Sequence, residues 1–181
     1  MIRRIVTCAA LALIPATALA QTPAPAASAN PSTAAVKAQF GMIKGVLTRT
    51  AAKVPEELYA FKATPDVRSI GQLIGHVADT QFMFCATAAG EKAPQSDIEK
   101  TMTTKAQLSK ALADSIAYCD KVIDAMNDTK GLEIVRLFGP TPRLHVLTFN
   151  IAHSYEHYGN LVTYMRLNKI VPPSSEPPPA R

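Results

Sequence analysis

The stretch "FNIAHSYEHYGNLVTYMRL", residues 149–167, holds two histidines, His153 and His157, with Glu156 between them. Residues four apart lie on the same side of a helix, so two imidazoles at this spacing can bind one ion. The string also reads H-x-x-E-H, which is the pattern of one class of zinc peptidase. Three interpretations therefore stand: a metal site, a peptidase motif, or two histidines in an ordinary helix.

A helical wheel separates Glu156 from the two histidines. His153 and His157 fall on a largely apolar arc, whereas Glu156 falls on a small and polar arc that is expected to face solvent. Because the glutamate of a zinc peptidase must act beside the ion, this separation disfavours the peptidase motif. Two imidazoles on an apolar face both need partners for their ring nitrogens, and the pair alone leaves metal binding and core packing equally supported. A further arc, expected to face the core, holds Leu144, Leu147, Ile151, Tyr155, Tyr158, Val162 and Met165.

A metal site needs a third ligand, and His76 in "GQLIGHVADTQFMFC" is the candidate. His145 falls on the polar arc and is expected at the surface, while Cys85 lies on the opposite side of its helix from His76. Read alone, His76 is a histidine at the boundary of the core that faces water; read beside His153 and His157, it completes a ligand set across a bundle. Three neutral imidazoles leave coordination positions open, as in catalytic sites, and suit zinc, nickel, iron or copper.

Four helices and no strand are expected to position these side chains. Apolar spacing and helix-terminal residues predict helices over residues 32–53, 69–90, 104–127 and 141–167. Ser69 with Gln72, and Thr104 with Gln107, form capping-box patterns. Pro142 is expected in the first turn of the last helix. The predicted fold class is all-α, a four-helix bundle.

The two ends of the chain are expected to lie outside the bundle. Residues 1–20 carry two arginines, an apolar run and a small-x-small sequence, which predict a signal peptide cleaved after Ala20. Residues 21–31 form an Ala/Pro linker and residues 172–181 a Pro-rich tail, both expected to be disordered, with the bundle over 32–171. No later apolar run is long enough to cross a bilayer, so a periplasmic or secreted location is expected.

The mature chain is only mildly basic, with seventeen Lys and Arg against fourteen Asp and Glu after removal of the leader. These charges are scattered, so nucleic-acid binding gains no support. Two cysteines remain, Cys85 and Cys119. Outside the cytoplasm they could form a disulfide or remain two buried thiols, and both alternatives stay open.

The ordered set "RSIGQLIGHVAD", the histidine pair and "YGNLVTYMRLNKIVPPSS" resembles the DinB/YfiT-like superfamily over nearly the whole mature domain. The resemblance implies a four-helix bundle in which His76, His153 and His157 bind one divalent transition metal, zinc or nickel before iron or copper. It also implies metal-dependent enzymes, among them thiol-dependent S-transferases, a maleylpyruvate isomerase and hydrolases, with homodimers common. Export departs from the cytoplasmic pattern and puts thiol transfer in doubt.

The expected function is therefore a metal-dependent hydrolase or transferase acting on an unidentified small molecule. Asp79, Tyr155 and Glu156 are candidates for supporting roles around the ion. The alternatives are a non-catalytic bundle that binds a metal or a small ligand, and a bundle whose site is inactive.

Overall fold

The computed structural model describes residues 28–177, and this part of the chain is mostly helical. The predicted signal peptide, residues 21–27 of the linker and residues 178–181 of the tail lie outside the described residues. The elements in chain order are α1 (Pro31–Lys53), η1 (Glu56–Leu58), α2 (Ile70–Ala89), α3 (Ile98–Thr101), α4 (Lys105–Asp124), α5 (Asp128–Gly131), β1 (Ile134–Leu137), β2 (Gly139–Pro142), α6 (Arg143–Leu167) and η2 (Pro173–Ser175).

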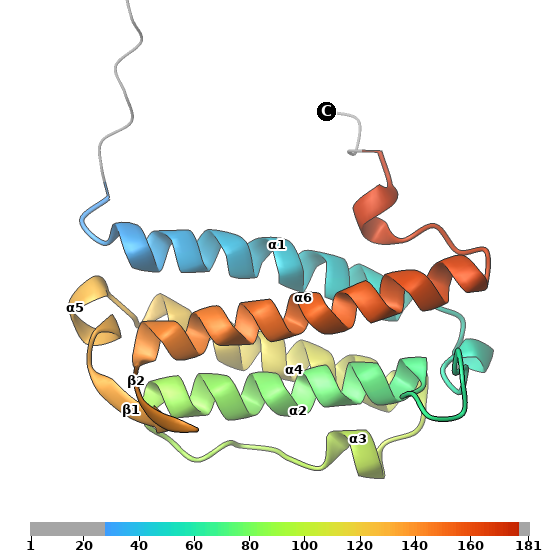
Figure 1. The fold of residues 1–181 in the computed structure, drawn as a ribbon, viewed down its shortest axis with the longest axis horizontal. Coiled ribbons are helices and arrows are strands. Elements are labelled where there is room, and N and C mark those ends of the chain that lie inside the picture. The colour runs from blue at the N-terminus through green and yellow to red at the C-terminus, as the bar shows by residue number, and fades with distance from the viewer. Residues whose placement is uncertain (1–27, 178–181) are drawn as a thin grey trace, which may run out of the picture.

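Four long helices, α1, α2, α4 and α6, lie side by side (Figure 1). Both α1 and α2 pack against α4 and α6, so each of these two helices contacts the same pair of neighbours. The arrangement agrees with the predicted bundle. Its apolar interior includes Phe40, Ile43, Leu47, Ile74, Val77, Phe84, Leu112, Leu147, Leu161 and Met165.

Local signals in the sequence define most helix ends. Both capping boxes are present: the side chain of Ser69 accepts from the backbone N–H of Gln72, and Thr104 accepts in the same way from Gln107. Gly90 ends α2 with φ of 80°, a left-handed conformation that glycine adopts without strain. The third predicted helix was expected to end near Asn127, but α4 ends earlier, at Asp124.

The prediction of no strand is wrong for residues 134–142. There β1 and β2 form an antiparallel hairpin, with Ile134 opposite Pro142 and Leu137 opposite Gly139. The strands have four residues each, and β2 carries prolines that normally argue against a strand. Pro142 therefore lies at the N-cap of α6 in an extended conformation, and not in the first helical turn.

The expected disorder of the tail is wrong for residues 172–177. The buried Pro173 begins η2, and the backbone N–H of Ser174 donates to the hydroxyl of Tyr158 at 3.0 Å. Glu176 forms an ion pair with Lys53 at the end of α1. The first part of the tail is thus packed against α1 and α6.

The open question about the cysteines has a definite answer in the structure, where Cys85 and Cys119 are joined by a disulfide. Their Cα atoms are 5.3 Å apart, and the bond links α2 to α4. Among residues 28–177, no helix has both the length and the apolar character that a membrane span requires.

Candidate metal centre

The three predicted histidines come together between α2 and α6. These helices pack against each other and run in opposite directions (Figure 1). His76 lies on α2, and His153 and His157 lie on α6. The ring centroid of His76 is 4.7 Å from that of His157 and 5.2 Å from that of His153. One nitrogen from each of the three imidazoles lies within 4.8 Å of the other two. His145, by contrast, is exposed, as expected.

His76 is held by a carboxylate that the sequence analysis missed. Its Nδ1 lies 3.0 Å from Oε2 of Glu99, and the other oxygen of Glu99 accepts from Nε of Arg68 at 2.8 Å. An ionised carboxylate only accepts hydrogen bonds, so Nδ1 of His76 is the donor. The lone pair of His76 is therefore on Nε2, which is the atom left to bind an ion.

Asp79 caps the start of α3, and the supporting role around an ion stays a prediction for this residue. Its two carboxylate oxygens accept the backbone N–H groups of Ile98 and Glu99, each at 2.9 Å. These N–H groups belong to the first turn of α3, where they have no partner within the helix. Within residues 28–177 Asp79 forms no hydrogen bond to an imidazole, and its hydrogen-bonded link to His76 runs through Glu99.

The pair on α6 has a geometry that fits a shared ion. Nε2 of His153 and Nε2 of His157 are 3.1 Å apart, and two nitrogens that each bind one ion at about 2.0–2.1 Å are separated by roughly 3 Å. Nδ1 of His153 lies 3.4 Å from the hydroxyl of Thr80, which donates its own proton to the carbonyl of His76. Nδ1 of His157 is buried and has no hydrogen-bond partner among residues 28–177. A divalent ion would satisfy the facing nitrogens, so the residues present fit a metal.

Burial keeps the pair in the neutral form that a metal requires. Burial, with further contributions from His157 and His76, lowers the pKa of His153 from 6.5 to about 4. Burial is also the main cause that lowers the pKa of His157, with His76 second. Neutral imidazoles are available near pH 7, and metal binding there needs no proton release from these rings.

The lowered pKa of His153 predicts a pH-dependent stability in metal-free protein. As the pH falls from 6.5 towards 4, the unfolded chain binds a proton at this position before the folded chain does, so stability falls and then levels off below about pH 4. After allowance for partial exposure we expect a loss of about 1–2 kcal/mol relative to His153→Gln. Urea unfolding with a chelator across this pH range measures it. A constant difference between the two proteins would contradict the lowered pKa.

Tyr155 and Glu156 do not contact the imidazole nitrogens through any hydrogen bond in the described residues. Tyr155 was expected in the core but is 42% exposed. The buried face of α6 is turned towards the histidine arc and includes Asn150 and Ser154, so Tyr155 at the far edge of the predicted core arc is left outside. Glu156 is exposed, as its arc predicted, and its charge partly offsets the lowering of the pKa of His157.

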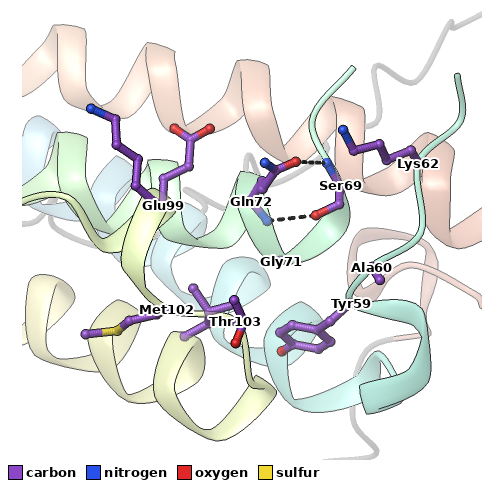
Figure 2. Close-up of a pocket in the computed structure, with 11 residues that line it drawn as sticks. Tyr59, Ala60, Lys62, Ser69, Gly71, Gln72, Glu99, Met102 and Thr103 are labelled. Atoms are coloured by element: carbon purple, nitrogen blue, oxygen red, sulfur yellow. Dashed lines mark hydrogen bonds between the residues drawn. The ribbon is translucent and has the colours of Figure 1, made fainter. Parts of the chain in front are cut away.

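A cavity of about 560 Å³ opens beside His157. A second cavity of about 530 Å³ lies next to it, and Lys62, Gln72 and Glu99 line both. Figure 2 shows Gln72 and Ser69, joined by the capping-box hydrogen bonds, between Glu99 and Lys62. The first cavity is also lined by Asp66, Val67, Arg68, Leu73, Glu156, Asn160 and Tyr164. The imidazole of His157 therefore borders a space large enough for a small molecule.

The fold and the site together define a helical protein with a three-histidine cluster beside an open, mostly polar cavity. The chain belongs to the DinB superfamily, whose family model matches residues 39–161.

Solved structures of the same superfamily share this fold. A DinB-like protein from Bacillus cereus has a TM-score of 0.68 and 14% identity, over 76% of this chain and 93% of that one. A DinB-like protein from Bacillus subtilis has a TM-score of 0.63 and 19% identity, over 75% and 92%. A mycothiol-dependent maleylpyruvate isomerase has a TM-score of 0.57 and 14% identity, over 74% of this chain and 65% of that one. No curated protein sequence matches the chain.

Proposed function

We propose that this protein is an exported metal-dependent enzyme, a hydrolase or transferase that acts on a small molecule. His76, His153 and His157 hold one divalent transition metal, with zinc or nickel before iron or copper. The observation that carries the proposal is the convergence of three imidazole nitrogens within 4.8 Å of one another, with His157 at the border of a cavity.

An ion held by three imidazoles supplies a Lewis acid to one atom of a bound substrate. The chain itself supplies the surroundings. Arg68, Lys62 and Asn160 offer hydrogen-bond donors in the cavity, while Glu156 and Asp66 offer carboxylates. This lining suits a small polar molecule that carries both donor and acceptor groups.

The open cavity supports an enzyme over a purely structural metal site. A structural site surrounds its ion with protein ligands on all sides, whereas a catalytic site leaves a position for substrate. His157 borders the cavity, and three histidine ligands fill fewer positions than these metals accept. The non-catalytic bundle that binds a metal or a small ligand is the alternative.

Export is the second part of the proposal. The disulfide between Cys85 and Cys119 supports it, because disulfides persist outside the cytoplasm and are rare inside it. The mature protein would begin at Gln21, and mass spectrometry of protein from the periplasm or the medium tests this directly. One of the solved relatives is a mycothiol-dependent enzyme, but an exported protein would meet little of such a thiol. The expected homodimer stays a prediction.

Metal analysis of the native protein should find about one equivalent of ion, and the double substitution His153→Ala/His157→Ala should reduce it to background. His145→Ala is the matched control, because it removes an exposed imidazole from the same helix and should leave the ion in place. Native protein that holds no metal after loading with zinc, nickel, iron and copper in turn would overturn the proposal. Loaded protein that fails to turn over any substrate in a broad hydrolase and transferase screen would favour the non-catalytic alternative.

A further inference from the structure

We propose that Glu99 is the positioning residue of the metal site, because it orients His76. Gly75 and Asp79 on α2 in turn fix the position of Glu99. This inference rests on the proposed metal-binding function of His76 but concerns the orientation of that side chain. Four residues form one path of contacts. Gly75 and Asp79 on α2 contact Glu99 on α3, and Glu99 contacts the imidazole of His76 on α2.

The end of the path is the hydrogen bond between His76 and Glu99. His76 Nδ1 donates to Oε2 of Glu99 at 3.0 Å, which selects the tautomer with a bare Nε2. The bond from Arg68 Nε to Oε1, at 2.8 Å, fixes the other oxygen and therefore the plane of the carboxylate. A free imidazole side chain can adopt several orientations and either tautomer. Glu99 restricts His76 before an ion binds, so less conformational entropy is lost on binding.

The start of the path is the close approach of α3 to α2. A Cβ atom on Gly75 would lie 2.8 Å from Cα of Glu99 and 3.1 Å from its backbone nitrogen, so only glycine permits this contact. Asp79, one turn further along α2, accepts the backbone N–H groups of Ile98 and Glu99. With Ile98 fully buried, three contacts fix a helix of four residues that is too short to be stable alone.

If Arg68 and Glu99 formed only an ordinary surface ion pair, the contacts of Gly75 and Asp79 with α3 would not be needed. Exposed pairs contribute little, and such a pair tolerates movement of either side chain. Glu99 instead lines both cavities and reaches inwards to His76. Gly75 and Asp79 both contact the backbone of Glu99, which indicates that the position of Glu99 must be accurate.

The tautomer of His76 in metal-free protein tests the proposal. Proton–nitrogen correlation spectra of protein labelled at histidine, recorded with a chelator, distinguish Nδ1–H from Nε2–H, and His76→Gln identifies the signal. We expect Nδ1–H in the native protein and a mixture or Nε2–H in Glu99→Ala. Glu156→Ala removes the same charge from the cavity wall without a hydrogen bond to an imidazole, and should leave the tautomer unchanged. Nε2–H in the native protein, or no change in Glu99→Ala, would overturn the proposal.

The backbone part of the path has its own pair of variants. Gly75→Ala keeps the identity of Glu99 and of all three histidines, but it forces α3, which carries Glu99, away from α2. It should therefore relax the tautomer as Glu99→Ala does. Gly159→Ala adds the same methyl group to α6 in open space and should change nothing. If the native tautomer persists in a folded Gly75→Ala protein, α3 does not position Glu99 and the proposal fails.

Zinc affinity gives a second readout that separates this inference from the proposed function. Loss of a hydrogen-bond partner of a metal-binding histidine typically weakens affinity about 10–100-fold, and we expect this range for Glu99→Ala in competition with a chromophoric chelator. Glu156→Ala should weaken it less. Equal losses in the two variants would overturn the positioning role while metal binding stands. If native protein binds none of zinc, nickel, iron and copper, the proposed function fails, and the tautomer experiment still decides whether Glu99 orients His76.

Discussion

Replacing Cys85 and Cys119 together with alanine lowers the free energy of unfolding by about 3–4 kcal/mol. The disulfide closes a segment of 34 residues, and cross-linking a segment of this length restricts the unfolded chain by roughly that amount. Urea denaturation without reductant measures the loss as a lower midpoint. Because none of the three candidate ligands lies on α4, the folded variant should bind the same amount of metal as the native protein.

Reduction of the native protein is the control for this result. With dithiothreitol present, the native midpoint should fall to a value near that of the variant, whose own midpoint should not respond to reductant. Equal midpoints for the native protein and the variant under oxidising conditions would contradict the bond between Cys85 and Cys119.

The second large effect is expected at Gln81, a fully buried amide that connects three helices. Its Oε1 accepts from Ser115 on α4 at 3.0 Å, and its Nε2 donates to Ser154 on α6 at 3.5 Å. Methionine has nearly the same size and shape but cannot make these bonds. Gln81→Met should therefore cost about 2–3 kcal/mol, because it leaves buried hydroxyls with fewer partners. Thermal or urea unfolding measures the change.

A triple variant separates the lost hydrogen bonds from any misfit of the methionine. Gln81→Met/Ser115→Ala/Ser154→Ala removes every member of the network, and burying apolar groups in place of paired polar ones is close to neutral. It should recover most of the lost stability. A triple variant that is less stable than Gln81→Met alone would show that shape, and not hydrogen bonding, decides the effect. Gln81 directly follows Thr80 on α2, and Ser154 directly follows His153 on α6. The network therefore also affects how these two helices are aligned at the candidate metal centre.

The parts of the fold that sequence reasoning predicts are those with strong local signals. Ser69, Thr104 and Gly90 define helix ends through interactions within a few residues, and their positions are confirmed. The helical spacing of residues 141–167 placed His153 and His157 on a largely apolar face, and in the structure His153 is half-buried and His157 is buried. The two predicted helices that carry these histidines and His76 pack against each other, and this packing brings His76 to the pair.

The parts that it misses depend on contacts between distant residues. Glu99 lies in a short turn of helix whose preceding residue, Asp97, has φ of 61°, and no periodicity marks it. Its role follows only from the contact with His76, 23 positions earlier in the chain. Likewise the hairpin is hidden by Pro140 and Pro142, which oppose a strand locally but are tolerated where two short strands pair beside a helix.

The segment between Gly90 and Thr104 runs along the outside of α2 and returns through α3 (Figure 1). It supplies Glu99 to both cavities, yet it contributes none of the three histidines. Connections between helices accept insertions and substitutions far more readily than packed helices do. The three candidate metal ligands thus lie on packed helices, whereas Glu99 reaches the cavities from a connection between helices. Changes confined to this one connection could alter which molecules enter while the helices that carry the imidazoles stay as they are.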